Sequence, residues 1–339
     1  MSGSKPPHHP ITSAASMRRL FSLLLTHPGF RRAFLRLLKT IFSTYLRPQY
    51  FQGRAHAKVP LEMDLDACVP FDLTWLACYV GFVRLWQGSL GWLHRTFGDR
   101  ALPEMEAFLA GMESLFLAAR EVFAVTDSTV SSRPGPWPPG CRPSLDWLMI
   151  QQADRNSFCF PSLHVMIARY TAIRIGAAID LLQAQDGAGP VERKASGEAG
   201  EDDSFRAEKG FLEERAARIT ESIVYVKQHS LSDIPAGLFL LRNMQVTGDC
   251  PASTLEDDMR FMRLLFPGGD GRITPFMIAL YQRLERALQA DRMGASAFAG
   301  PAPGLPQRVL LDFLKDYRQE TSALMLQAFH PGIPTERPS

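Results

Sequence analysis

The chain has 339 residues, of which 46% are hydrophobic and 21% charged, so it can bury a sizeable core and is not disordered as a whole. A formal net charge of +2 argues against a protein that binds nucleic acid through a strong overall field. The five cysteines lack CxxC spacing, which argues against a disulfide framework or a zinc cluster and favours a reducing compartment.

The N-terminal part of the chain differs in composition from the rest. Residues 1–16 are rich in Ser, Pro and His and are predicted to be disordered. Residues 17–60 form a predicted basic amphipathic arm, because the chain carries ten Lys or Arg and no acidic residue before Glu62. The alternation of basic residues with Leu and Phe is typical of a helix on an anionic membrane surface. The alternative is a packed helix whose basic face is solvated.

Helical periodicity dominates the chain from residue 17 onward, and no alternating pattern indicates a sheet. We expect helices over residues 17–46, 72–94, 103–125, 162–184, 211–241, 255–266, 273–291 and 306–328. Residues 133–143 form a predicted proline-rich loop, and residues 185–210, rich in Gly, Ala and acidic residues, a predicted flexible insertion. A linker at 293–306 is expected to leave 307–339 as a separate tail helix.

No charge-free apolar run reaches the roughly 20 residues that a membrane-spanning helix needs. Arg169 and Arg174, for example, interrupt the apolar stretch 163–182. Charges turned toward a protein interior would still be compatible with spanning. We therefore expect membrane association, through shallow helices or a bundle with inward-facing charges, and keep a soluble cytoplasmic protein as the alternative.

A first candidate for chemistry is residues 160–165 (FPSLHV), which open an apolar helical stretch. Pro161 suits the first turn of a helix, where free backbone N–H groups favour a bound anion. Beside a bound phosphate, His164 would be placed to donate a proton to a leaving oxygen. A lone histidine in an apolar stretch is, however, more often structural.

A second candidate is the pair His229 and Asp233, which are four residues apart and would share one face of a helix. Asp233 would then hold one imidazole nitrogen and leave the other as a nucleophile. Lys227 would supply positive charge to a phosphate. The alternative for the pair is a local hydrogen bond with no function.

Together, and in this order, the two segments resemble motifs of the type 2 phosphatidic acid phosphatase superfamily, which also contains vanadium haloperoxidases and lipid phosphotransferases. Residues 161–164 (PSLH) match the second motif, Pro-Ser-x-His. Ser222, His229 and Asp233 match the third motif, in which Ser-Arg, five residues, His, three residues and Asp follow one another. The resemblance covers about residues 64–240 and is greatest to the branch of bacterial and inositol-phosphoceramide-synthase-like proteins.

The resemblance implies an all-α fold, a helical bundle of that family's type with a basic N-terminal amphipathic helix and extra C-terminal helices. The core would span residues 61–245, including the insertion, and the C-terminal helical extension residues 246–339. The segment Asp66–Trp75 (DACVPFDLTW) is similar to a short acidic and Pro-Phe segment that precedes the core in that branch.

The resemblance also implies phosphoester chemistry that needs no metal and no cofactor. His229 would attack phosphorus and form a phosphohistidine, Asp233 would orient and charge its imidazole, and His164 would protonate the leaving oxygen. The residues expected to bind the phosphate are Arg133, Lys227, Ser162 and Arg155. For Arg155 a salt bridge in the loop or a helix-entry cap is the alternative.

The chain departs from the family pattern at two cations. The first motif is Lys, six residues and Arg-Pro; Arg133 stands at its end, but Thr126 occupies the Lys position. In the third motif Ile223 occupies the Arg position, and Lys227, four residues later on the predicted helix, is expected to substitute. These losses would mean an altered substrate, slow turnover or an inactive site.

Two classes of function follow. The first is a phosphatase or phosphotransferase that acts on a lipid-type phosphoester, with a phosphorylated lipid and an anionic membrane surface as partners and no nucleic acid. The second is a non-catalytic lipid- or phosphate-binding protein that keeps the fold. The retention of both histidines and of Asp233 favours the enzyme. Hydrolysis versus transfer, the headgroup and the oligomeric state stay open.

Overall fold

The computed structural model describes residues 9–51, 58–125, 127–135, 144–153, 158–187, 205–244, 253–294 and 304–317. This part of the chain is mostly helical, which confirms the all-α class. The long helices of the bundle are α1 (Ala14–Thr26), α2 (Pro28–Ile41), α5 (Gly81–Phe97), α6 (Leu102–Phe123), α8 (Leu163–Gly187) and α9 (Arg206–Tyr225). The other α-helices are α3 (Arg47–Phe51), α4 (Leu76–Tyr79), α7 (Leu145–Ala153), α10 (Asp233–Asn243), α11 (Leu255–Arg263), α12 (Ile273–Gly294) and α13 (Leu305–Lys315).

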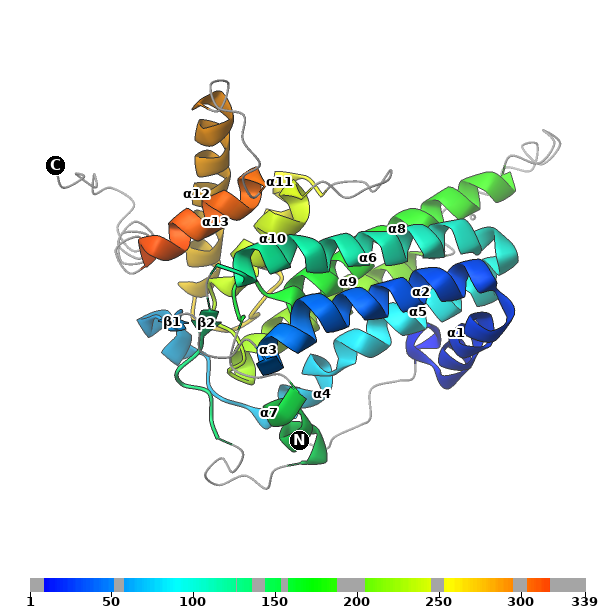
Figure 1. Cartoon of the computed structure of the whole chain (residues 1–339), viewed down its shortest axis with the longest axis horizontal. Coiled ribbons are helices and arrows are strands. Elements are labelled where there is room, and N and C mark those ends of the chain that lie inside the picture. The colour runs from blue at the N-terminus through cyan, green and yellow to red at the C-terminus, as the bar shows by residue number, and fades with distance from the viewer. Residues whose placement is uncertain are drawn as a thin grey trace.

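Helix α8 lies at the centre of the bundle and contacts α5, α6, α9 and α10. Helix α2 packs on α6, and α1 packs on α5. In Figure 1 these long helices run alongside one another, and α12 and α13 lie at one end of the bundle. Short helical turns complete the chain: η1 (Pro10–Thr12), the π-helix η2 (Phe42–Leu46), η3 (Asp64–Cys68), η4 (Leu73–Trp75) and η5 (Gly98–Ala101).

The helix predicted over residues 17–46 is divided at His27. Pro28 cannot continue α1, because it lacks the backbone N–H, but it suits the first turn of α2. Ordered structure also begins earlier than predicted: Ile11 is fully buried and the Ser13 hydroxyl caps α1 by accepting from Ser16 N. The prediction of disorder is therefore wrong for residues 9–16, and residues 1–8 lie outside the described part.

The packing of α1 on α5 requires a glycine at position 91. A Cβ added to Gly91 would lie 1.9 Å from the carbonyl oxygen of Ser16, which is far inside van der Waals contact. By contrast, a Cβ added to Gly176, in the middle of α8, would meet nothing within 4 Å. Close helix–helix approach thus depends on Gly91 and not on Gly176.

We expect Gly91→Ala to lower the free energy of unfolding by about 1–3 kcal/mol, because α1 must move away from α5. Gly176→Ala, the matched control, is expected to raise it by up to about 1 kcal/mol through helix propensity alone. Urea unfolding of both variants beside wild type measures the two changes. Equal effects of the two substitutions would contradict the close packing.

Two short strands lie between the helices. Strand β1 (Lys58–Pro60) pairs in parallel with β2 (Asp127–Thr129), with Val59 opposite Ser128. The expectation that the chain has no sheet is wrong here, because three-residue strands are too short to show alternation. The pairing ties the segment before the core to the segment after α6.

The two arginines that interrupt the apolar stretch of α8 are paired inside the bundle. The Arg169 guanidinium donates to both carboxylate oxygens of Glu213 on α9, at 2.7 and 2.6 Å. Arg174 donates to Glu104 on α6 at 2.7 Å. These pairs explain how a helix with buried faces on several sides tolerates two cations.

Within the described ranges, none of the helices combines the length and the apolar character that crossing a membrane requires.

The helix predicted over residues 211–241 is two helices. Helix α9 ends at Tyr225, and α10 begins at Asp233. Lys227 has a φ of 55°, in the left-handed region, which is incompatible with a continuous helix. The break is where the second candidate segment lies, so His229 stands in a turn and Asp233 in the first turn of α10.

The C-terminal part of the chain is packed on the core. Tyr281 on α12 donates to Asp258 on α11 at 2.6 Å, and Phe313 on α13 stacks on Phe160 with ring centroids 5.8 Å apart. The expectation of a separate tail helix is therefore wrong for residues 305–317, and residues 318–339 lie outside the described part. Residues 188–204, most of the predicted insertion, also lie outside it.

Candidate functional site

The start of α8 and the start of α10 bring the two candidate segments together. Gly237 favours their close approach, since a Cβ there would lie in tight contact, 3.1 Å from the carbonyl oxygen of Ser162 and 3.2 Å from Val165 Cβ. As a result His164 and His229 lie with their ring centroids 5.6 Å apart and their planes at 69°. The two segments, whose histidines are 65 residues apart in the sequence, thus form one cluster of polar side chains.

Two acceptors determine the tautomer of His229. Its Nδ1 lies 3.0 Å from Asp233 Oδ2 and 2.9 Å from the carbonyl oxygen of Cys159. Because a carboxylate and a carbonyl both accept hydrogen bonds, Nδ1 must carry the proton. The lone pair is then on Nε2, to which the Ser162 hydroxyl donates over a long 3.4 Å. In the neutral imidazole, Nε2 of His229 therefore carries the lone pair and accepts only a weak hydrogen bond.

Asp233 is fully buried, and this burial raises the pKa of its carboxyl group, opposed by the hydrogen bonds from His229 and from Ser230 N. Its Oδ2 accepts from both donors at 3.0 Å. Its Oδ1 has no hydrogen-bond partner among the described residues. Although His229 and Asp233 do not share one continuous helix as expected, they meet because Asp233 reaches back from the first turn of α10.

His164 is enclosed by aromatic side chains. Its ring stacks on Tyr79 at 4.4 Å between centroids, and Phe82 meets it edge to face at 4.5 Å. These residues come from α4 and α5, which are far from either motif in the sequence. Both histidines are buried but keep a small exposed fraction, 6% for His164 and 7% for His229.

The expected phosphate-binding cations are less well placed. Arg133 is half-buried and donates to the carbonyl oxygen of Ile150 at 3.5 Å; in the described part of the chain it makes no hydrogen bond to the two histidines. Ile223, at the position of the family's Arg, is fully buried. Arg155 and Thr126 lie outside the described residues, so the role expected for Arg155 stays a prediction.

Lys227 has a different environment from the one expected. Its ammonium group donates to the carbonyl oxygens of Asp66, at 2.8 Å, and Val69. Burial lowers the pKa of Lys227, while the neighbouring Asp66 and Glu62 oppose that shift. The expectation that Lys227 follows Ile223 on one helical face is wrong, because α9 ends between them. Two of its three protons are already held, so phosphate binding by Lys227 stays a prediction.

Asp66 is a buried acid next to this site that the sequence reasoning did not single out. Its Oδ1 accepts from Leu231 N at 2.7 Å, and its Oδ2 accepts from Met63 N at 2.9 Å. The hydrogen bond to Leu231 N thus stabilises the turn that carries His229. The one sequence feature that points to Asp66 is its place in the segment Asp66–Trp75, which resembles a segment that precedes the core in the type 2 phosphatidic acid phosphatase superfamily.

Burial raises the pKa of Asp66 to about 7, further helped by Asp233 and opposed by the two backbone N–H groups and Lys227. The folded state then binds more protons than the unfolded state between about pH 4 and 7, so the stability that this group contributes is lost as the pH rises through about 7. We expect the stability difference between wild type and Asp66→Asn to fall by up to about 1.4 kcal/mol per pH unit in this range.

Urea unfolding from pH 4 to 8 measures this difference, with the exposed Asp64→Asn as the control in the same segment. A difference between wild type and Asp66→Asn that does not change with pH would contradict the raised pKa.

The short strand β2 also supports the site. Ser128 Oγ accepts from Phe160 N at 2.7 Å, and Ser128 O accepts from Cys159 N at 3.3 Å. Cys159 is the residue whose carbonyl accepts from His229. Strand β2 therefore holds the backbone carbonyl that determines the tautomer of His229. The sequence does not predict this strand, because its three residues are too few to show alternation.

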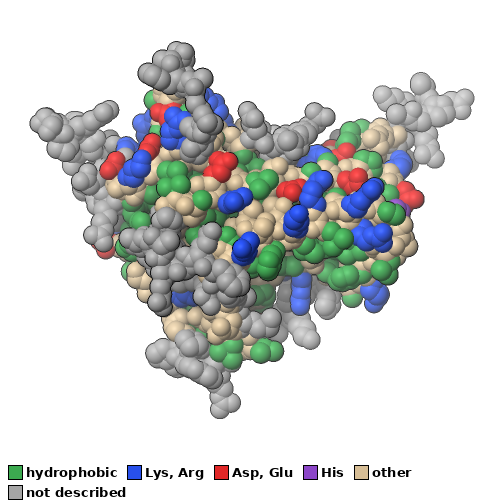
Figure 2. Space-filling model, in the orientation of Figure 1, with side chains coloured by type: hydrophobic (Ala, Val, Ile, Leu, Met, Phe, Trp, Pro, Cys, Tyr) green, Lys and Arg blue, Asp and Glu red, His purple; other side chains and the backbone are tan. Residues whose placement is uncertain are grey.

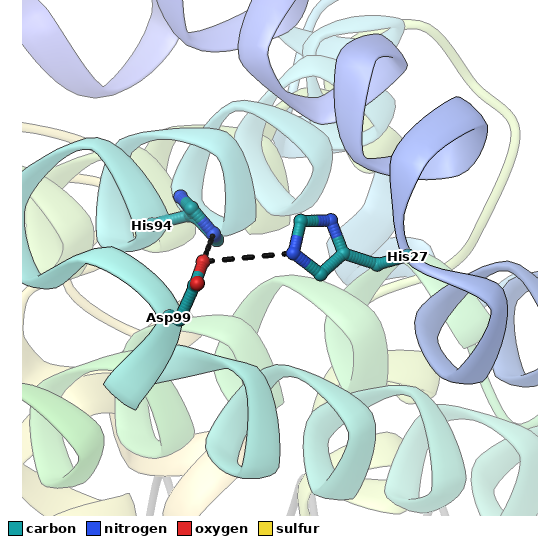
Figure 3. A group of neighbouring side chains, drawn as sticks. All are labelled: His27, His94 and Asp99. Carbon is teal, nitrogen blue, oxygen red and sulfur yellow. Dashed lines mark hydrogen bonds and ion pairs between the residues drawn. The ribbon is translucent and has the colours of Figure 1, made fainter.

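A second histidine cluster lies between α1, α5 and η5 (Figure 3). One ligand atom from each of His27, His94 and Asp99 lies within 4.8 Å of the others, a spacing that a metal ion could occupy. However, Arg19 Nε donates to His94 Nδ1 at 3.0 Å, so the proton of His94 is on Nε2 and is donated to Asp99, also at 3.0 Å. A metal on Nε2 would force the proton onto Nδ1, against the Arg19 N–H. Arg19, His94 and Asp99 therefore form a hydrogen-bonded chain, beside which His27 Nε2 lies 3.5 Å from Asp99 Oδ1.

Comparison of the chain with models of known families, with curated proteins and with solved structures finds no match.

Proposed function

We propose that the chain is a phosphoester hydrolase or phosphotransferase that forms a phosphohistidine on His229 and acts on a lipid-type phosphate. The observation that supports this most is the fixed tautomer of His229, whose Nδ1–H is held by Asp233 and Cys159 and whose Nε2 accepts only a long hydrogen bond, 3.4 Å, from Ser162. A nucleophilic histidine needs this arrangement, because the orienting carboxylate also stabilises the positive charge that develops on the ring.

The reaction would proceed in two steps. In the first, Nε2 of His229 forms a bond to phosphorus, the ester P–O bond breaks, and the leaving oxygen takes a proton from His164. In the second, water or an acceptor alcohol attacks phosphorus and gives its proton to His164, and the P–N bond breaks. Backbone N–H groups at the start of α8 would hold phosphoryl oxygens, together with the Ser162 hydroxyl once it turns from His229 to the substrate.

The lipid nature of the substrate rests on the resemblance of the two motifs to the type 2 phosphatidic acid phosphatase superfamily. The aromatic surroundings of His164 are compatible with it, since Tyr79 and Phe82 would keep water from the leaving oxygen.

A second candidate is a non-catalytic protein that binds a lipid phosphate. Two observations favour it: a buried Ile223 stands where the family has an arginine, and the Lys227 ammonium is held by two carbonyl groups. A site with few cations stabilises the charge of the transition state less well.

Phosphate release from radiolabelled phosphatidic acid, with and without an added acceptor alcohol, distinguishes the two. We expect turnover by wild type and a base-stable, acid-labile phosphoenzyme that is absent from His229→Ala. His94→Ala, which removes another buried imidazole, is the matched control and should keep both the turnover and the phosphoenzyme. If wild type gives no turnover, no transfer product and no phosphoenzyme, the chain is the non-catalytic binder.

A further inference from the structure

The outer face of α2 carries a surface that the proposed chemistry does not use. The inner face of this helix packs on the bundle through Phe30, Phe34 and Leu37, which are buried. The Phe34 ring lies 5.9 Å from that of Trp86 on α5, between centroids. Helix α2 is therefore firmly attached, so the face that it turns outward is defined.

Three large apolar side chains lie on the outer side of α2 and at its junction with η2. Leu35, Leu38 and Phe42 are 56%, 43% and 57% exposed. Their spacing of three and four residues aligns them in one stripe along the helix. A soluble helix normally places polar residues on such a face, so the stripe needs a partner.

Basic side chains accompany this stripe. Arg31, Arg32 and Lys39 are exposed on the same helix, and no carboxylate of the described residues pairs with them. Residues 28–46 contain no acidic residue at all. Figure 2 views the molecule from this side, and Lys and Arg side chains alternate there with hydrophobic ones over the line of α2. We call Arg31, Arg32, Leu35, Leu38, Lys39 and Phe42 the α2 outer face.

We propose that the α2 outer face docks the protein on an anionic lipid bilayer, with α2 lying parallel to the membrane plane. Phe and Leu side chains in a stripe enter the boundary between headgroups and acyl chains, while flanking Lys and Arg meet the negative lipid headgroups. Basic and apolar residues mixed on one convex helix fit such a surface, because it offers negative charge and an apolar layer at every point. The inference stands apart from the proposed function, which concerns the His229 site.

The test is cosedimentation with vesicles of phosphatidylcholine containing phosphatidylglycerol and with vesicles of phosphatidylcholine alone. Wild type is expected to bind the anionic vesicles more tightly, and added salt should weaken the binding. Arg31→Gln/Arg32→Gln/Lys39→Gln should weaken it on the order of 100-fold. Leu35→Ser/Leu38→Ser/Phe42→Ser should weaken it at least about tenfold.

Matched triple variants remove equal charge or apolar surface elsewhere. They are Arg260→Gln/Arg263→Gln/Lys315→Gln, at exposed positions, and Leu145→Ser/Leu181→Ser/Leu264→Ser, whose side chains are 73%, 45% and 55% exposed. Both should bind as wild type does, and thermal unfolding verifies that every variant is folded.

The proposal is overturned if wild type does not bind anionic vesicles, or if the α2 variants bind as well as their matched controls. His229→Ala is expected to bind vesicles like wild type, so membrane docking and phosphoester chemistry succeed or fail separately.

Discussion

Asp233→Asn is expected to lower kcat by about 10³- to 10⁴-fold with a much smaller change in KM. In wild type, Asp233 Oδ2 accepts from Nδ1 of His229, and the lone pair is on Nε2. An Asn side chain is neutral, so it no longer stabilises the positive charge that develops on the imidazole during attack, although the carbonyl oxygen of Cys159 still accepts from Nδ1–H. Binding of the substrate phosphate does not depend on this stabilisation, so KM should change little.

The measurement is steady-state kinetics of wild type and variant with the same lipid phosphate. Asp258→Asn is the matched control, because Asp258 is also a buried acid whose pKa burial raises, and it lies on α11 outside the site. A similar loss of kcat in both variants would show that any buried Asp is needed for folding. A loss below tenfold in Asp233→Asn would contradict its role in orienting His229.

His164→Ala is expected to lower kcat/KM by about 10²- to 10⁴-fold for an alkyl or lipid phosphate. For an aryl phosphate with an acidic phenol as leaving group the loss should be much smaller, because that oxygen leaves without being protonated. The dependence on the leaving group separates proton donation from a merely structural role, which would lower both rates alike.

The comparison needs the rates of both substrates in both proteins, at a pH where wild type is active. His94→Ala serves as control, since it also removes a buried imidazole but leaves the ring pair of His164 and His229 intact. Equal losses for the lipid and the aryl phosphate would argue that His164 only fills the space between Tyr79 and Phe82.

Much of the candidate site follows from the sequence, because short-range spacing governs it. The helix over residues 162–184 appears as α8, and the pair His229 and Asp233 makes the expected hydrogen bond. The two residues do not share one continuous helix as expected, because the apolar periodicity continues through residues 226–232 whereas the chain turns there. Apolar residues in a buried turn have the same composition as those in a buried helix, so the pattern could not locate the break.

The partners of these residues depend on contacts that have no local sequence pattern. The β1–β2 pairing brings the carbonyl oxygen of Cys159 to the turn of His229, from a position 70 residues away. The short helix η3 brings Asp66 to the same turn, from a position more than 160 residues away. Likewise, Lys227 binds the carbonyl groups of Asp66 and Val69 because the turn places its ammonium group beside them. From the sequence alone, the charge of Lys227 is expected to bind phosphate.

The sequence was sufficient for the all-α class, the main helix positions and the two polar segments, because helical periodicity and spacing within a segment are local properties. Tertiary packing decided which nitrogen of His229 carries the proton, which cations are already held, and which face of α2 stays exposed. These properties depend on hydrogen bonds and burial between segments that are distant in the chain. The free energy of such interactions depends on both partners, so the sequence of one segment does not predict it.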